Sequence, residues 1–122
     1  MPAFKDNVSE QELDDLAKHI LALSQGSEHA AGKELYNSKG CFGCHGMEAK
    51  GVEMMGGANF TDTIWRFAPG TEESIKYTIT NGVNAPGNDA TRIAIMPVFK
   101  EQLTETEIKK LAVYVHKLGG GQ

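Results

Sequence analysis

Apolar side chains recur at helical spacing close to both ends of the chain. Each stretch begins with a capping box, Ser9 with Glu12 and Thr104 with Glu107, which pairs orphan backbone donors at a helix start. Apolar residues then fall at i, i+3, i+4 and i+7, and a glycine ends each stretch. They are Leu13, Leu16, Ala17 and Ile20 in the first stretch, and Ile108, Leu111, Ala112 and Val115 in the second. The pattern predicts two amphipathic helices, the second over about residues 104–118.

The middle of the chain predicts shorter helices separated by loops. We expect helices over about residues 28–38, 62–67 and 71–81, the last with acidic residues in its first turn and Gly82 at its end. Residues 83–95 are expected to form a loop. No alternating apolar pattern lasts long enough for a sheet, so the sequence predicts a small all-α fold.

The two outer helices are parts of an internal repeat. Residues 1–26 align with residues 96–121 without a gap, and ten of the 26 positions are identical. The identical residues of the first copy are Met1-Pro2, Phe4-Lys5, Glu10, Glu12, Leu16-Ala17, Leu23 and Gly26. Helical spacing alone could make two helices similar, but it does not account for the shared Met-Pro or the common cap register. We therefore expect residues 1–26 to be the C-terminal tail of an upstream domain with a short linker, and residues 27–122 to be one complete domain.

The chemistry of the chain is concentrated in Cys41-Phe42-Gly43-Cys44-His45. This Cys-X-X-Cys-His arrangement attaches heme covalently, because the two thiols bond the porphyrin vinyl groups and the histidine ligates the iron. A zinc site would need four ligands, yet the chain has two cysteines and its other histidines are scattered. A redox pair would be expected in a βαβ context. One covalent heme c is the predicted cofactor, and a zinc site or redox thiols are the alternatives.

Composition and charge limit the partners and the cellular location that we expect for this domain. The formal net charge of −4 argues against a nucleic-acid partner. No stretch approaches the ~20 apolar residues needed to span a bilayer. No apolar run follows the first residues, so no signal peptide is recognised. Because heme attachment normally takes place outside the cytoplasm, we expect the chain to be the soluble fragment of a longer, exported protein.

Further motifs make the chain resemble class I cytochromes c, and most closely the second heme domain of the diheme subunit of cbb3-type cytochrome c oxidases. The matching residues besides the attachment motif are Gly32-x₃-Tyr36, Asn59-Phe60-Thr61-Asp62-x-x-Trp65, Thr78-Ile79-Thr80-Asn81-Gly82, Met96-Pro97 and Leu111-Ala112-x-Tyr114-Val115. The resemblance covers residues 27–121, with the tail of a preceding domain before them. It implies an all-α class I cytochrome c fold in which Gly32 and Tyr36 cross Leu111 and Tyr114.

The resemblance also implies that His45 and Met96 are the axial ligands of the heme iron. A thioether opposite an imidazole raises the reduction potential of the iron. Met47 lies too close to His45 in the chain to reach the opposite heme face. Met54 and Met55 fall in a glycine-flanked loop, where filling an apolar gap is the simpler role. Met55 is the main alternative to Met96.

Two neighbouring side chains, Trp65 and Arg66, carry N–H groups suited to heme propionates, although a core Trp beside a surface Arg explains them almost as well. By the repeat, Met1 corresponds to Met96 and would be a ligand of the upstream heme; a start residue is the equal alternative. Many cytochromes place a proline in the loop whose carbonyl accepts from the proximal histidine. This chain has Gly56-Gly57-Ala58-Asn59 there, so the acceptor for His45 stays open.

Electron transfer is the function that the resemblance implies. The domain would accept electrons from a donor cytochrome or another c-type heme domain and pass them to the oxygen-reducing catalytic subunit of a cbb3-type oxidase. It would lie on the periplasmic side of the bacterial inner membrane, held there by other parts of the parent protein, and would not be an enzyme alone. The alternatives are a free-standing soluble monoheme carrier and, if Met96 binds the iron loosely, a ligand-binding or peroxidase-like heme domain.

Overall fold

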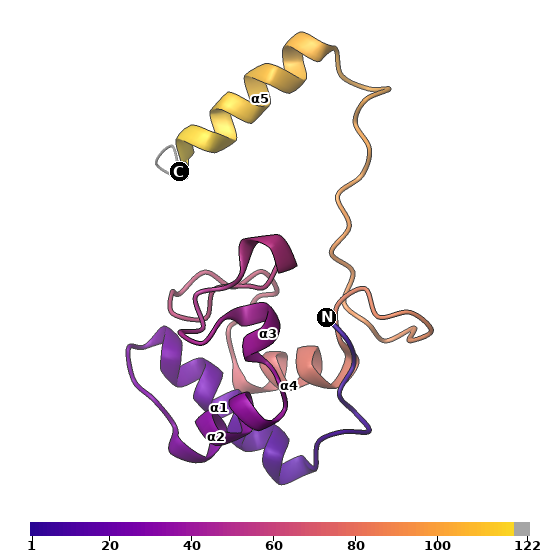
Figure 1. The fold of residues 1–122 in the computed structure, drawn as a ribbon. Helices are drawn as coiled ribbons and strands as arrows, with labels where there is room; N and C mark the ends of the chain where they lie inside the picture. Colours follow the sequence, from indigo (N-terminus) through magenta and orange to yellow (C-terminus); the bar gives the residue numbers. More distant parts are fainter. Residues whose placement is uncertain (119–122) are drawn as a thin grey trace.

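A computed structural model describes residues 1–118, which form helices joined by loops (Figure 1). The elements are α1 (Glu10–Ser24), α2 (Ala30–Ser38), α3 (Phe42–His45), the 3₁₀ helix η1 (Glu53–Met55), α4 (Glu72–Asn81) and α5 (Glu105–Leu118). An isolated bridge joins Val83 and Arg92, and residues 1–118 contain no strand. The all-α prediction is confirmed. Residues 119–122, the end of the predicted domain, lie outside the described part.

The long helices begin where their capping residues predict. The Ser9 side chain accepts from the Glu12 backbone N–H, while the Glu12 carboxylate accepts from the Ser9 backbone, so the predicted capping box is formed. The Thr71 side chain caps α4 by accepting from the Ser74 backbone N–H, and Gly82 follows the last residue of that helix. The predicted helices over residues 28–38, 71–81 and 104–118 are confirmed as α2, α4 and α5.

The predicted helix over residues 62–67 is wrong. The Asn59 side chain accepts a hydrogen bond from the Thr61 backbone at 2.8 Å, and the Asp62 side chain accepts from the Ile64 backbone at 2.8 Å. Short polar side chains that bond the backbone two residues ahead favour turns over helix, so this stretch folds as successive turns. The short helices α3 and η1 were not predicted, because each lies within the glycine-rich loop.

The core forms where α1 packs across α2 and α4. Its most deeply buried residues on α1 are Leu16 and Ala17, which are 1% and 0% exposed, and Tyr36 of α2 is 3% exposed. Gly32 makes the crossing possible, since a Cβ at this position would overlap the backbone carbonyl of Asp15. This corrects the expectation that Gly32 and Tyr36 cross the C-terminal helix: in this structure the N-terminal copy of the repeat takes that place.

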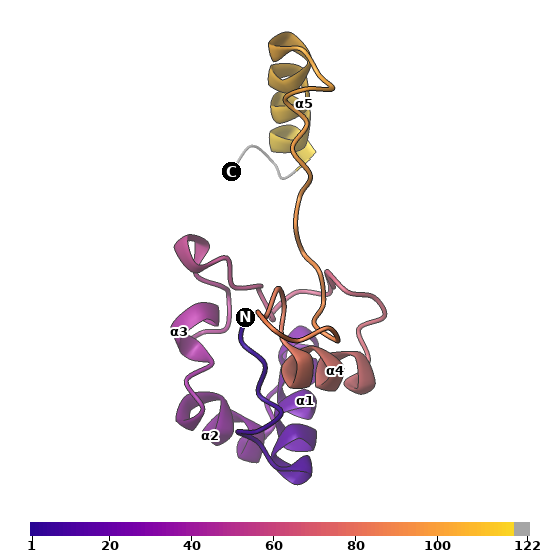
Figure 2. The ribbon, with the colours of Figure 1, turned by 90° about the vertical axis from the view of Figure 1, so that its right-hand side faces the viewer.

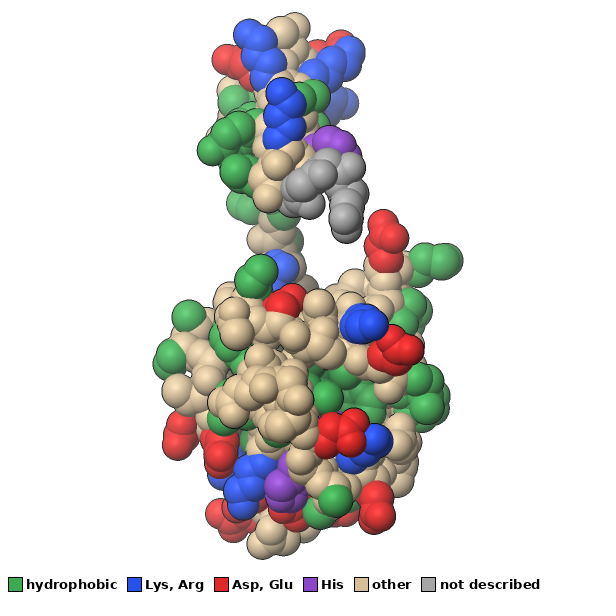
Figure 3. Space-filling model, turned by 90° about the vertical axis from the view of Figure 1, so that its left-hand side faces the viewer, with side chains coloured by type: hydrophobic (Ala, Val, Ile, Leu, Met, Phe, Trp, Pro, Cys, Tyr) green, Lys and Arg blue, Asp and Glu red, His purple; other side chains and the backbone are tan. Residues whose placement is uncertain are grey.

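Helix α5 stands apart from the other helices in both ribbon views (Figures 1 and 2). Segment 93–99 has no regular structure and leads away from α4. Leu111 and Tyr114, which were expected in the crossing, are 49% and 60% exposed. Hydrophobic side chains gather along one side of this helix in the space-filling view (Figure 3). The apolar face of α5 is thus open to solvent in this conformation.

Backbone bonds hold the first residues of the chain against the end of α4. The Met1 amino group donates to the Val83 carbonyl, and the Val83 N–H donates to the Met1 carbonyl, both at 3.0 Å. The Phe4 N–H donates to the Ile79 carbonyl at 3.0 Å. Gly82 lies beneath this segment, because a Cβ there would come within 2.7 Å of the Met1 carbonyl oxygen. Segment 1–4 is therefore built into the fold before α1 begins.

Ion pairs add to the packing of α1. Lys39 bonds the Glu12 carboxylate at 2.8 Å and lowers the pKa of that group to about 2. Lys76 of α4 pairs with Asp14.

None of the helices within residues 1–118 is both long and apolar enough to cross a membrane.

Candidate heme site

The attachment motif forms one turn of helix. Gly40, at a φ of +76°, ends α2 in the left-handed region and turns the chain into α3. Cys41 has helical backbone angles and Cys44 and His45 follow within the same turn. Residues at i, i+3 and i+4 of a helix share one face. The fold therefore presents both thiols and the imidazole on the same side.

The His45 ring is oriented by the carbonyl of Ala58. The Nδ1 atom lies 3.0 Å from this oxygen. A carbonyl can only accept, so the hydrogen bond requires the proton on Nδ1 and leaves the lone pair on Nε2. This is the tautomer that ligates a metal through Nε2, and it supplies the acceptor that the sequence left open.

Close backbone contacts bring Ala58 to the histidine. Gly57 packs against the Cys44 carbonyl, and a Cβ at Gly57 would overlap that oxygen. Gly51 has a φ of +85°, and its N–H donates to the His45 carbonyl at 2.8 Å. The loop thus returns across α3 at a distance that only glycine permits. The glycine-rich stretch positions the proximal acceptor.

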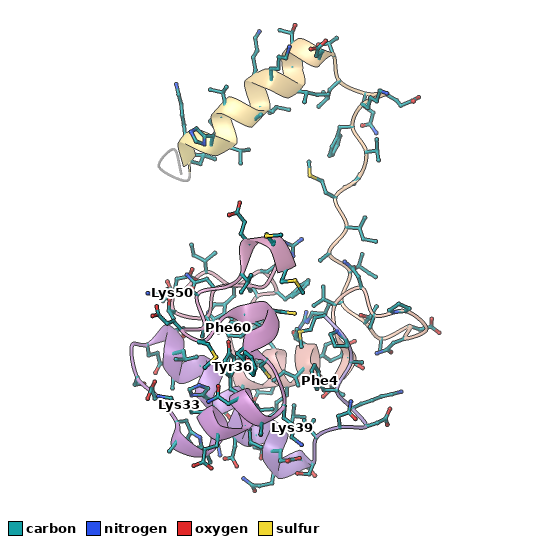
Figure 4. All side chains as sticks on the ribbon, in the orientation of Figure 1. Phe4, Lys33, Tyr36, Lys39, Lys50 and Phe60 are labelled. Carbon is teal, nitrogen blue, oxygen red and sulfur yellow. The ribbon has the colours of Figure 1, made fainter. Side chains whose placement is uncertain are left out.

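Two aromatic side chains support the motif from the interior (Figure 4). The Phe60 ring stacks on the His45 ring, with centroids 4.2 Å apart and planes at 24°. The Tyr36 hydroxyl donates to the Gly46 carbonyl at 2.7 Å and so ties α2 to the residue after His45. The orientation of the imidazole therefore depends on packing as well as on one hydrogen bond.

A cavity of about 470 Å³ opens beside the motif. Both cysteines and His45 line it, and most of the remaining lining is apolar or aromatic and comes from α1, α4 and the loops. These further residues include Met1, Phe4, Leu16, Ile20, Met55, Phe60, Ile64, Trp65, Phe67, Ile75, Ile79 and Ala94. An apolar cavity with two thiols and a ring nitrogen at one wall suits a flat apolar macrocycle attached by thioethers and ligated by imidazole. The residues present fit a heme c.

Burial sets the protonation of the motif in the free polypeptide. Burial raises the pKa of the Cys41 thiol. It also lowers the pKa of His45, an effect that the hydrogen bond to Ala58 partly opposes. Burial therefore favours the neutral imidazole, which is the form that ligates iron.

A family model described as "Cytochrome C oxidase, cbb3-type, subunit III" matches residues 27–115. The chain belongs to this family. Membership supports the class I cytochrome c fold predicted from the sequence and indicates heme c as the cofactor. The matched residues begin after α1 and contain the whole attachment motif.

Relatives of this cbb3-type subunit domain include cbb3-type cytochrome c oxidase subunits FixP and CcoP. FixP of Azorhizobium caulinodans is 38% identical over 100% of this chain and 40% of its own length. FixP of Bradyrhizobium sp. (strain ORS 278) is 38% identical over 91% of this chain and 36% of its length. CcoP of Rhodobacter capsulatus is 35% identical over 91% of this chain and 37% of its length. The chain thus spans about two fifths of these relatives.

The cbb3-type subunit domain brings some predicted site residues together and leaves one apart. Cys41, Cys44 and His45 meet at the cavity, and Trp65 and Arg66 also line it. The Trp65 indole lies against Gly70, where any Cβ would collide with the ring. Met96 is 79% exposed on the segment that leads to α5 and is not among the lining residues. The expected approach of Met96 to the motif is not seen in this conformation.

Two methionines line the cavity in place of Met96. Met1 reaches it through the backbone pairing with Val83, and Met55 reaches it from η1. Met55 is the main alternative ligand from the sequence, whereas the repeat assigns Met1 to an upstream heme, with a start residue as the equal alternative. The repeat contained the signal for Met1, because it aligns Met1 with Met96. Ala58 carried no such signal, since it contributes a backbone carbonyl that any residue possesses.

Proposed function

We propose that this domain transfers electrons through one heme c, bound by thioethers at Cys41 and Cys44 and ligated by His45. The observation that carries the proposal is the hydrogen bond from His45 Nδ1 to Ala58 beside an apolar cavity that both cysteines line. The bound heme would supply a one-electron couple. The chain supplies an oriented imidazole, a rigid attachment turn and a wall of apolar side chains that limits water.

We propose Met96 as the second axial ligand. The Asn84 side chain donates to the Ala94 carbonyl at 3.2 Å and accepts from its N–H at 2.9 Å. Ala94 lines the cavity, so Met96 follows two residues beyond its rim, and Pro97 restricts the backbone behind it. Trp65 and Arg66 are proposed as donors to the heme propionates, because both line the cavity and carry N–H groups.

We propose that electrons arrive from a donor cytochrome or another c-type heme domain and leave towards the catalytic subunit of a cbb3-type oxidase, on the periplasmic side of the inner membrane. The names of the relatives and the family membership support this assignment. They favour an oxidase subunit over a free-standing carrier. Catalysis of oxygen reduction would belong to the complex and not to this domain.

The domain division is also a proposal. Residues 1–26 are proposed as the tail of an upstream heme domain and residues 27–122 as a complete domain. The repeat supports this division, and the family match begins at residue 27. The FixP relative from Azorhizobium caulinodans aligns with the whole chain over only 40% of its own length.

The first test is the heme content and axial ligation of the matured protein. We expect a mass increase of one heme, lost in a Cys41→Ala/Cys44→Ala variant. The charge-transfer band of ferric, methionine-ligated heme should be lost in Met96→Ala and kept in Met55→Ala. A colourless protein with the bare polypeptide mass would contradict the proposal, and loss of the band in Met55→Ala alone would move the ligand to that residue.

The second test separates electron transfer from ligand binding. Within the assembled oxidase complex, the Cys41→Ala/Cys44→Ala variant should lose oxygen uptake driven by a reduced donor cytochrome. The matched control, Cys41→Ala alone, keeps one attachment point and should keep part of the activity. Carbon monoxide binding to the reduced wild-type domain would indicate an open coordination position and would favour the ligand-binding alternative, for which the exposure of Met96 is the supporting observation.

A further inference from the structure

The face of α1 that is buried in the core has an exposed counterpart on α5. Ile20 is 6% exposed, whereas Val115, at the same place in the repeat, is 63% exposed. Leu16 and Leu111 form a second such pair, at 1% and 49%. The α1 side chains lie against α2 and α4. One copy of the repeat thus fills a groove that the other copy matches in sequence and register.

Contacts at the rim of this groove depend on backbone, which both copies share. The Met1 and Phe4 backbones bond Val83 and Ile79. Gly82 packs directly against the main chain of residues 1–3, because a Cβ at Gly82 would lie 2.7–2.9 Å from atoms of that main chain. At the helix crossing, Gly32 likewise packs against a backbone group, the carbonyl of Asp15. The Met-Pro start and the helix register recur in the second copy, so the same backbone groups would face the same glycines.

We propose that α2, α4 and Gly82 form one docking groove that segment 96–118 occupies in exchange with segment 1–24 of the same chain. Exchange of the segment also exchanges the methionine that reaches the cavity, Met1 for Met96. The groove exchange itself does not depend on the heme, and only the exchange of the methionine rests on the proposed function. The chain therefore has two conformations that share one body, residues 27–94.

The body does not need to unfold for the exchange. The Asn84 N–H donates to the Arg92 carbonyl at 2.8 Å, and the Asn84 side chain bonds Ala94. Arg92 in turn bonds Thr78 and Ser74 of α4. Loop 83–94 is therefore fixed to α4, and the second segment starts at the rim of the cavity. Only segment 1–24 has to leave, since segment 95–104 already extends from the loop.

The charged residues beside the groove favour docking of segment 1–24 over docking of segment 96–118. Lys39 bonds Glu12, and the repeat keeps a glutamate, Glu107, at that place. Lys76 pairs with Asp14, but the repeat places Lys109 there. Docking of α5 would therefore set two like charges against each other, whereas docking of α1 pairs opposite charges. The charges therefore favour the arrangement in which α1 is docked and identify Lys76 as the residue that biases the exchange. The proposed bond from Met96 to the heme iron would favour the arrangement in which α5 is docked.

Hydrogen exchange read by mass spectrometry on the heme-loaded protein tests the proposal, because it reports each helix separately. In the wild type, amides of α1 and of α5 should each be protected in part, because the charges favour docked α1 and the proposed bond from Met96 to the heme iron would favour docked α5. Leu16→Asp expels α1, so protection should move to α5 while the heme spectrum and cooperative melting persist. The matched variant Leu111→Asp should leave α1 protected. The double variant should lose protection in both helices and melt at a lower temperature than either single variant.

The charge bias has its own variant and control. Lys76→Glu repels Asp14 and attracts Lys109, so it should shift the ratio of α5 to α1 protection about tenfold towards α5. Lys50→Glu makes the same charge change on the body, where Lys50 pairs with Glu48, and should leave the ratio unchanged.

Three results would overturn the exchange. One is fast exchange of α5 in Leu16→Asp, with stability as low as in the double variant. Another is a protection ratio that Lys76→Glu and Lys50→Glu change equally. The third is α5 protection that rises with protein concentration together with dimer formation, because the groove would then be filled by a second copy. A heme-free protein could show the full exchange pattern, so failure of the proposed function is distinguishable from failure of the exchange.

Discussion

The Nδ1 atom of His45 lies 3.0 Å from the carbonyl oxygen of Ala58, across a loop of glycines. This relationship fixes the tautomer of the imidazole and directs its lone pair to Nε2. It exists because Gly57 packs against the Cys44 carbonyl at a distance that no side chain allows. The orientation of the ligand therefore depends on a residue without a side chain of its own.

Gly57→Ala should disturb the heme site without touching a ligand. The added methyl group overlaps the Cys44 carbonyl, so the loop must move and the hydrogen bond to His45 must lengthen. We expect a loss of about 1–3 kcal/mol in the free energy of unfolding and altered paramagnetic shifts of the ferric heme. Gly43→Ala is the control, since a Cβ there meets nothing within 4 Å. Equal effects of the two variants would contradict the assigned role of Gly57.

Gly32→Ala should weaken the helix crossing and leave the heme chemistry unchanged. The methyl group would overlap the Asp15 carbonyl, which pushes α1 away from α2. Chemical denaturation of the holoprotein should show a loss of about 1–3 kcal/mol with an unaltered visible spectrum. Lys33→Ala at the exposed neighbouring position should change stability by less than about 0.5 kcal/mol. A spectral change in Gly32→Ala would mean that the crossing also controls the site.

Tyr36 should make the folded protein less stable at alkaline pH. Burial raises the pKa of this phenol to about 12, against 10.0 in the unfolded chain. Because the folded protein holds the proton more tightly, the stabilisation is complete below pH 10 and is lost as the pH rises from 10 to about 12. Tyr36→Phe should flatten the melting temperature across this range. It should also lower stability at neutral pH by about 0.5–1.5 kcal/mol, through loss of the bond to Gly46.

His19 should make the free energy of unfolding decrease in mild acid. It is 3% exposed, and its Nδ1 accepts from the His29 backbone at 3.3 Å. Burial lowers the pKa of His19 below its ordinary 6.5, so the unfolded chain takes up the proton first. Stability is therefore fully present above pH 6.5 and is lost as the pH falls from 6.5 through the folded pKa.

The His19 contribution can be isolated with a residue taken from the repeat. His19→Tyr introduces the aromatic residue that the second copy carries at position 114. This variant should lose the slope of stability against pH just below 6.5 and keep the steeper loss at lower pH, where carboxylates such as Glu12 are protonated. An unchanged slope in thermal melts from pH 7 to 5 would assign the dependence to another group.

Local sequence determined the helices and the attachment turn of this protein. Capping residues such as Ser9 and Thr71 bond groups within three residues of themselves, so their effect is readable without tertiary structure. The same local chemistry explains the failed helix over 62–67, where Asn59 and Asp62 bond the backbone ahead of them. The cofactor is likewise readable, because its attachment chemistry requires five consecutive residues.

Tertiary structure alone decided which copy of the repeat enters the core and which carbonyl orients the histidine. Both repeat copies have the same apolar register, so the apolar pattern does not choose between them. The choice depends on long-range charges, such as Lys76 opposite Asp14. Ala58 acts through its main chain, which is identical in every residue, and its position follows from glycine contacts far from the ligand in sequence. Periodicity and motif spacing describe neighbours along the chain, whereas these two features are set by neighbours across the fold.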